Sequence, residues 1–286
     1  MGNNSIKNNS IKNNLTKEDI ISDIILSMGA DIQDINVYIL VEGEGDVSLI
    51  RPFLKENVII YESYDGKHGV EYIVGEYFYK NEKVIGIRDR DYQLQAISEK
   101  IFYYDYGCME MMLVSNEDVF SNLCYEYYRG ELSSKELRDY IFQQLKPLSI
   151  IRLHNEREQW EIILKGLSIK NVWKEKNNEI DNDAIIDKIN VMNNGFINES
   201  LYRRIKEESM IEWKKEDFFS YTQGHDFFTL FTIICNQYRK RGIKSSEAEA
   251  SARCIFRWSD MIKTLLYRQI IMYAKEKNLK IMSESI

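Results

Sequence analysis

The stretch Val37–Val41 constrains the fold of this chain more than any other. Five consecutive apolar or aromatic residues, rich in β-branched types, are typical of a strand buried on both faces. The acidic turn Glu42-Gly-Glu-Gly-Asp46 follows at once. We expect Gly43 and Gly45 to take backbone angles that other residues avoid, so that Glu42 projects from the carboxyl end of the strand. Asp46 is then predicted to be the N-cap of a helix.

A second apolar stretch, Val84–Ile87, also ends in carboxylates. It runs into Arg88-Asp-Arg-Asp91, and side chains alternate in an extended segment, so Asp89 and Asp91 are expected on one side. Ligands of parallel α/β sheets bind outside the carboxyl ends of the strands, where Glu42 and Asp89 are predicted to lie. Three carboxylates converging on one sheet edge repel one another without a cation, which favours a metal site.

The pattern predicts two kinds of architecture in succession. Strands at 35–41, 57–61, 83–88 and 100–104 alternate with segments long enough for crossover helices, including 46–55 and 68–79. The fold class is therefore an α/β domain with a mostly parallel four-stranded sheet. After residue 116 a mainly α-helical region is expected, with a polar loop at 174–182. Its predicted helices are 117–129, 133–146, 156–167, 183–193, 198–209, 225–240, 246–257 and 259–277.

Three segments follow from this pattern. Residues 1–15, in which Asn-Asn-Ser-Ile-Lys occurs twice, form a polar tract predicted to be a disordered tail. Residues 16–115 are the predicted α/β metal-binding domain and residues 116–286 the helical domain. Thr16, with Asp19 three positions on, is predicted to cap the first helix.

Composition narrows the compartment and the partners. The net charge of −7 repels phosphate overall, so a nucleic acid would need local basic patches or bound metal. Four widely separated cysteines disfavour a zinc cluster or a disulfide framework. The absence of a long apolar run and of a signal peptide predicts a cytoplasmic chain without a membrane span. There is no nucleotide-binding P-loop, so any dependence on ATP would come from another chain.

The two acidic motifs in this order resemble the Toprim domain of topoisomerases, primases and OLD-type nucleases. The match is Leu40-Val-Glu-Gly-Glu-Gly-Asp46 followed by Asp89-Arg-Asp91, with Gly45 as an additional glycine. Glu110, within Cys-Met-Glu-Met-Met-Leu113, and the late Gly224-His-Asp226 are similar to Toprim-like proteins that pair with ABC-type ATPases in anti-phage systems. The family most similar is AriB, the nuclease subunit of the PARIS system. That resemblance implies a toxin effector that cuts host tRNA after release from its ATPase partner.

The residues suit this chemistry on their own terms. Hydrolysis of a phosphodiester needs charge neutralisation and an activated water, and Mg²⁺ or Mn²⁺ on carboxylates supplies both. We expect Glu42, Asp89 and Asp91 to hold the metal, with Glu42 alternatively acting as the general base. Predicted auxiliary roles go to the remaining candidates: Asp46 orients a metal-bound water, Lys67 stabilises the phosphorane, Arg88 or Arg90 holds the flanking phosphate, and Glu110 reaches the site.

Several candidates have a structural alternative. Asp46 is equally a helix cap, Glu110 a first-turn acid and Asp65-Gly66 an ordinary turn. His225 is expected to be a buried cap, and His154 a surface or packing residue. The basic run Tyr238–Lys244 either contacts a phosphate backbone, with Tyr238 stacking on a base, or serves a helix end.

Three functions therefore remain open. The first is a nuclease toxin acting on tRNA or other RNA in preference to DNA, partnered by an ABC-type ATPase. The second is an OLD-like DNA endonuclease or nickase. The third is a non-catalytic module that binds metal to regulate an ATPase complex. A homodimer is compatible with each of them.

Overall fold

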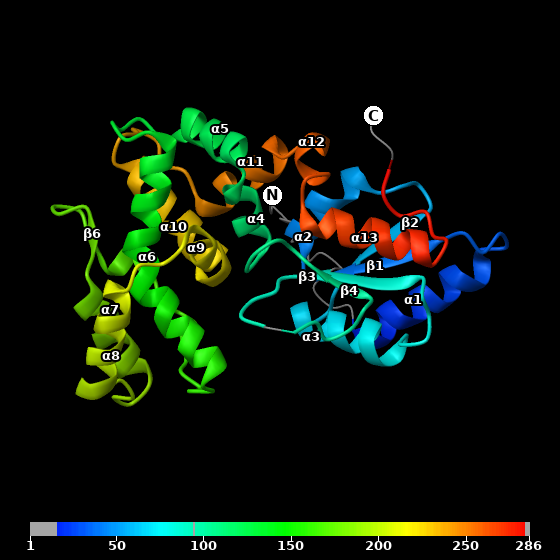
Figure 1. The fold of residues 1–286 in the computed structure, drawn as a ribbon, viewed down its shortest axis with the longest axis horizontal. Helices are drawn as coiled ribbons and strands as arrows, with labels where there is room; N and C mark the ends of the chain where they lie inside the picture. The colour runs from blue at the N-terminus through cyan, green and yellow to red at the C-terminus, as the bar shows by residue number, and fades with distance from the viewer. Residues whose placement is uncertain (1–15, 94, 284–286) are drawn as a thin grey trace, which may run out of the picture. The chain divides into compact units, whose positions relative to one another are not determined.

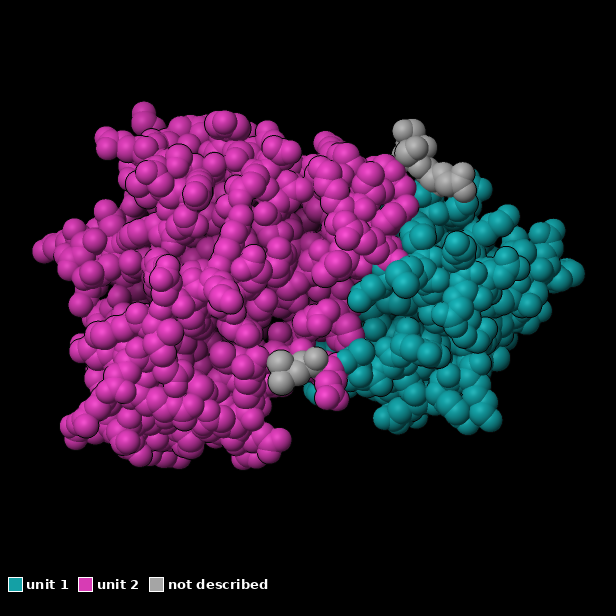
Figure 2. Space-filling view, viewed as in Figure 1, with its two compact units in different colours: residues 1–88, 96–102, 269–286 teal, residues 89–95, 103–268 magenta. Residues whose placement is uncertain are grey.

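The computed structural model describes residues 16–93 and 95–283 and divides them between two compact units. Unit 1 contains residues 16–88, 96–102 and 269–283, and unit 2 contains residues 89–93, 95 and 103–268 (Figure 2). The predicted tail at 1–15 lies outside the described residues. The predicted domain boundary between residues 115 and 116 stays a prediction.

Unit 1 is an α/β unit built on a parallel sheet. Its strands β1 (Val37–Val41), β2 (Val58–Glu62), β3 (Val84–Arg88) and β4 (Ile101–Tyr103) stand in the order β2-β1-β3-β4, all parallel. The central strand β1 is paired with β2 on one side and with β3 on the other, in a register that sets Val41 opposite Ile87. The predicted four-stranded parallel sheet is confirmed.

Helices cover both faces of this sheet. In Figure 1, α13 (Leu265–Glu276), whose residues from 269 on belong to unit 1, lies on one face, and α1 (Lys17–Ala30) and α3 (Gly66–Val70) lie on the other. The connection from β1 to β2 contains α2 (Glu44–Ile50) and a 3-10 turn at Arg51–Phe53, and a π-helix at Glu71–Tyr77 continues α3. All five residues of β1 are buried, because both faces of this strand are covered.

The structure confirms the predicted cap of the first helix in unit 1, but it contradicts one predicted crossover helix. Thr16 caps α1, and its side chain and Asp19 form the reciprocal capping box. The connection from β3 to β4 contains turns and no helix in its described residues, although a crossover helix was expected. The twelve positions 89–100 are about the minimum length for a connection between parallel strands, which is usually but not always a helix.

Unit 2 is almost entirely helical. Its helices are α4 (Met109–Ser115), α5 (Glu117–Tyr127), α6 (Ser134–Arg157), α7 (Asn182–Met192), α8 (Glu199–Met210), α9 (Lys215–Tyr221), α10 (Gly224–Asn236), α11 (Ser245–Ile255) and α12 (Trp258–Met261). The hairpin of β5 (Trp173–Lys174) and β6 (Glu179–Ile180) occupies the predicted polar loop. The core centres on phenylalanines of α5, α6 and α10, including Phe120, Phe142 and Phe227.

Two helix predictions in this region were wrong, and one helix was not predicted. No helix forms over most of 156–167, since α6 continues to Arg157 and the chain then turns with positive φ at Gln159 and Glu161. The helix predicted over 259–277 is divided into α12 and α13, with the Thr264 hydroxyl accepting from the N–H of Tyr267 at the break. Helix α9 was missed because it is only seven residues long.

No helix among the described residues is long and apolar enough to cross a membrane.

Candidate functional site

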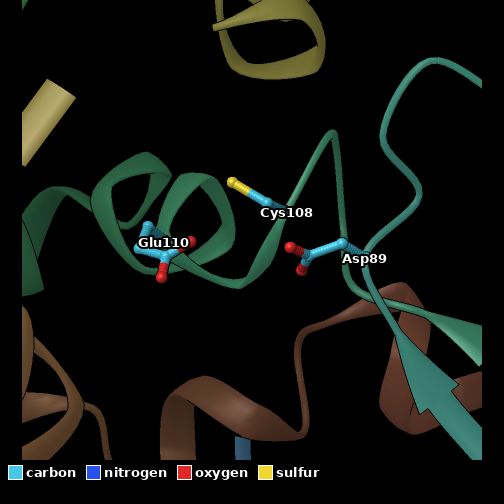
Figure 3. A group of neighbouring side chains, drawn as sticks. All are labelled: Asp89, Cys108 and Glu110. Carbon is cyan, nitrogen blue, oxygen red and sulfur yellow. The ribbon is translucent and has the colours of Figure 1, made fainter. Parts of the chain in front are cut away.

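Unit 2 gathers three potential metal ligands around the start of α4. One ligand atom from each of Asp89, Cys108 and Glu110 lies within 4.8 Å of the other two (Figure 3). Asp89 directly follows β3 in sequence, Cys108 is the N-cap residue of α4, and Glu110 lies in its first turn. Two of the three were predicted from the sequence, and Cys108 was not predicted as part of the site.

Asp89 also has a structural role. Its Oδ1 accepts a hydrogen bond from the N–H of Met109 at 2.9 Å. The N-cap side chain of Cys108 makes no cap hydrogen bond, so Asp89 satisfies one of the helix-terminal N–H groups from outside the helix. The same bond fixes the Asp89 carboxylate at the positive end of α4.

The Cys108 thiol is buried between acidic neighbours. Burial raises the pKa of Cys108 well above its ordinary value, and the negative charges of Glu110 and Asp89 raise it further. The thiol therefore stays protonated at neutral pH. The carboxylate oxygens of Asp89 and Glu110 are hard donors, which suit Mg²⁺ or Mn²⁺.

Two glycines let the start of α4 pack closely. A Cβ atom at Gly224 would lie 2.4 Å from Oε2 and 2.5 Å from Cβ of Glu110, so no larger residue fits there without displacing that carboxylate. A Cβ at Gly107 would lie 2.6 Å from the carbonyl oxygen of Ser220. The predicted Gly224-His-Asp226 motif thus contributes a glycine to the wall of the site.

A buried polar layer continues behind Gly224. The guanidinium of Arg152 donates to both carboxylate oxygens of Asp226, at 2.8 and 3.2 Å. Gln223 donates to the hydroxyl of Tyr92 at 3.2 Å, and burial raises the pKa of Tyr92 far above its usual value. The ion pair between Arg152 and Asp226 was not predicted, because the two residues are 74 positions apart in the sequence. His225, expected to be buried, is exposed in the first turn of α10.

Asp91 does not have the expected geometry. Its φ of 51° is left-handed, so the chain is not extended through this residue and the alternation argument fails. Its N–H donates to the carbonyl of Gly107 at 2.8 Å, which ties the turn to the residues before α4. In the part of the chain that the structure describes, the three-residue ligand group does not include Asp91. Arg90 lies over the ring of Tyr103 at 5.3 Å from its centroid.

In unit 1, Glu42 is paired with a buried cation. The Nε of Arg88 lies 3.7 Å from Oε1 of Glu42, and Arg88 also donates to Glu71. The Arg88 side chain is fully buried. The expectation that Arg88 holds a substrate phosphate is therefore wrong, because its charge is enclosed among carboxylates. The expectation that Glu42 needs a metal to offset its charge loses force for the same reason.

Asp46 is not the N-cap of α2. The helix begins at Glu44 with Gly43 as its N-cap, and Asp46 is the third helical residue. Its Oδ2 accepts from the N–H of Gly43 at 2.9 Å, so it closes the first turn from inside. Gly43 is extended, with φ of −159°, and neither Gly43 nor Gly45 has the positive φ that the sequence suggested.

Lys67 lies in the first turn of α3 and is half-buried, while the neighbouring His68 is exposed. Gly66 has a φ of +47°, and a Cβ there would lie 3.8 Å from Oε2 of Glu42. The Asp65-Gly66 turn therefore runs beside the Glu42 carboxylate within unit 1.

No family model matches the chain, and no curated protein matches it either. The resemblance to Toprim nucleases therefore rests on the motif residues and on the α/β sheet.

Proposed function

We propose that the chain is a metal-dependent phosphodiester hydrolase, with Asp89 and Glu110 as carboxylate ligands of Mg²⁺ or Mn²⁺. The observation that carries this proposal is the approach of these two carboxylates, together with the Cys108 thiol, to within 4.8 Å at the start of α4. Two carboxylates are hard oxygen donors and fit a hard cation.

The bound cation would lower the pKa of a water molecule and offset charge on the attacked phosphate. The chain's own part is to hold the two carboxylates: Asp89 through the N–H of Met109, and Glu110 through the space that Gly224 leaves. Glu42, Asp46 and Lys67 belong to unit 1, and Asp91 lies outside the ligand group. These four residues are proposed as site residues on the basis of the sequence alone.

The family resemblance extends the proposal to a biological role. It supports an effector of anti-phage defence in the cytoplasm that cleaves tRNA or other RNA and is held by an ABC-type ATPase. A cleavage assay on total tRNA, single-stranded RNA and supercoiled plasmid, with Mg²⁺, Mn²⁺ or EDTA, tests the chemistry. We expect RNA cleavage that EDTA abolishes and that Glu110→Gln reduces at least 100-fold. Plasmid nicking alone would indicate the OLD-like DNA activity instead.

The structure also favours a second candidate, a non-catalytic module. Asp89 caps α4 and Glu42 pairs with Arg88, so both carboxylates make contacts that stabilise the fold without a metal. Expression in bacteria separates the two candidates. A nuclease toxin slows growth unless its ATPase is co-expressed, and Glu110→Gln removes that effect. Equal growth with wild-type and Glu110→Gln chains at matched levels would favour the module.

A further inference from the structure

A groove in unit 2 lies away from the acidic group, between the β5–β6 hairpin and the ends of two helices. Its volume is about 680 Å³, within the range of small-molecule sites. Its lining includes Lys170, just before the hairpin, and Trp173 in β5. It also includes Thr232 in α10, Gln237 directly after α10, and Lys244 and Ser246 at the start of α11. Glu175 in the hairpin is the acidic residue of the lining.

Side-chain amides hold the walls of this groove in place. Asn236 accepts from the N–H of Ile243 at 2.8 Å and donates to its carbonyl at 3.0 Å, which closes the loop that follows α10. Gln237 donates to the Oδ1 of Asn178 in the hairpin turn at 2.8 Å. The loop and the hairpin are thus fixed to the same end of α10, so the walls of the groove are held by hydrogen bonds within the protein.

The basic run Tyr238–Lys244 divides into structural and exposed cations. Arg239 lies 5.6 Å from the ring centroid of Tyr127 and donates to the carbonyl oxygens of Glu126 and Tyr127, so it is part of the packing. By contrast, Lys240, Arg241 and Lys244 are exposed. Across residues 16–93 and 95–283 none of these three has a carboxylate within ion-pair distance. An anionic partner is the simplest reason for such a cluster on an acidic protein.

Aromatic rings accompany these cations. Trp173 is partly exposed on the groove wall, and Tyr238 is 50% exposed. The Tyr238 ring is held edge-on against Tyr128, with their centroids 5.7 Å apart, so one face is presented at low entropic cost. Cations that track a backbone next to rings that accept bases are the usual features of a single-strand binding surface.

We propose that this surface, comprising the groove and residues Tyr238–Lys244, binds single-stranded RNA. Phosphates lie on Lys240, Arg241, Lys244 and Lys170, and bases stack on Trp173 and Tyr238. A paired duplex does not offer unstacked bases to these rings, which favours a single strand or a loop. RNA is the partner that extends the proposed function, on which this inference rests.

Helix α10 links this surface to the acidic group within unit 2. Gly224 at its start is adjacent to Glu110, and Asn236 at its end closes the loop of the binding surface. Twelve helical steps of about 1.5 Å separate the two by about 18 Å. At about 3.4 Å per stacked nucleotide, cleavage is expected about five nucleotides from the part of the RNA that lies at the loop closed by Asn236.

The test is binding of a fluorescein-labelled 12-nucleotide RNA in EDTA, followed by anisotropy. The triple variant Lys240→Ala/Arg241→Ala/Lys244→Ala is expected to lose at least tenfold in affinity, and its salt dependence falls by about two in slope, since each single-strand phosphate contact contributes about 0.7. The control Lys165→Ala/Arg203→Ala/Lys206→Ala removes three exposed cations elsewhere in unit 2 and is expected to change affinity less than twofold.

Trp173 provides a second readout. RNA is expected to quench tryptophan emission in the wild type, and Trp173→Phe removes the quenching while keeping affinity within about threefold, since a flat ring remains. Equal losses in the two triple variants would overturn the inference, as would quenching that persists in Trp173→Phe. Displacement of the RNA by polyglutamate at equal charge would overturn it in favour of an acidic peptide site.

The same experiments separate this inference from the proposed function. RNA binding that depends on the basic residues, without cleavage in Mg²⁺ or Mn²⁺, would refute the nuclease and retain the binding surface. Cleavage that the triple variant performs with unchanged KM would refute the surface and retain the nuclease.

Discussion

The two units handle their carboxylates differently. In unit 1, Glu42 and Glu71 are paired with the fully buried guanidinium of Arg88. In unit 2, Asp89 accepts a hydrogen bond from the N–H of Met109, and the thiol of Cys108 is buried next to Asp89 and Glu110. Unit 1 thus has carboxylates beside a buried guanidinium, and unit 2 has carboxylates grouped with a thiol at the start of a helix.

The contrast distinguishes two roles that the carboxylates of an acidic motif can have. A carboxylate next to a buried arginine maintains the fold, and removing its partner leaves a buried charge. Two carboxylates close to each other repel, and a bound cation offsets that repulsion. The four predictions below test this contrast, beginning with the largest expected effect.

Arg88→Met is expected to destabilise unit 1 by about 3–5 kcal/mol, because it leaves Glu42 and Glu71 without their buried cation. Urea unfolding followed by circular dichroism measures the change. Arg90→Met is the matched control, since the half-buried Arg90 lies over an aromatic ring, and its loss is expected to stay near 1 kcal/mol or less. Similar losses in the two variants would mean that the buried cation has no special role.

Gly224→Ala is expected to destabilise unit 2 by about 1–3 kcal/mol, because the added methyl group overlaps Glu110. Metal-dependent activity is expected to fall more steeply than stability, since the carboxylate moves. Gly29→Ala is the control: nothing lies within 4 Å of its added Cβ, and in helix α1 it is expected to stabilise by up to about 0.5 kcal/mol. Thermal melts measure the stability of both variants, and cleavage rates measure their metal-dependent activity.

Asp89→Ala is expected to cost about 1 kcal/mol through the lost hydrogen bond from Met109, whereas Asp89→Asn retains an acceptor there and melts within about 1 °C of the wild type. Both variants are expected to lose the rise in Tm that millimolar Mn²⁺ gives the wild type, because a ligand stabilises only the fold that binds it. An intact Mn²⁺ shift in Asp89→Asn would exclude Asp89 as a ligand. Asp91→Asn, measured alongside, tests the ligand role predicted for Asp91 from the sequence.

Thiol labelling at pH 8 is the mildest test. Burial raises the pKa of Cys108, and raises those of Cys124 and Cys235 to about 12, so their thiolate fractions at pH 8 are lower than that of an ordinary thiol. Cys254 is exposed. We expect one thiol to react rapidly with a disulfide reagent, with the others at least tenfold slower. Fast labelling of two thiols in the wild type, reduced to one by Cys108→Ser, would contradict the protonated, buried Cys108.

The sequence predicted the elements whose signal is local. The buried strand Val37–Val41, its parallel neighbours and the Thr16 cap follow from residue type and spacing over a few positions, and the structure confirms them. The failures also have local causes. A glycine pair suggested left-handed turns, yet Gly43 is extended, and the Asp46 carboxylate closes the helix turn from inside.

The candidate site was only partly accessible to such reasoning. Glu110 was found from its motif, but the requirement for Gly224 comes from a contact across more than one hundred residues of sequence. The burial of Arg88 among carboxylates likewise depends on how three segments fold together. Conversely, the positive φ of Asp91 reflects its bond to Gly107, which no spacing rule contains.

The composition of unit 1 has a consequence for the order of folding during synthesis. Residues 269–283 belong to this unit: Tyr273 donates to the carbonyl of Glu82, the N–H of Ser283 bonds to Phe53, and Met282 forms a bridge with Leu54. The ribosome makes them about 180 residues after Arg88, a delay of roughly 10–35 seconds at bacterial rates. Unit 1 therefore waits, incomplete, while the whole of unit 2 emerges. Until α13 is made, the sheet face on which it lies has no cover from this helix.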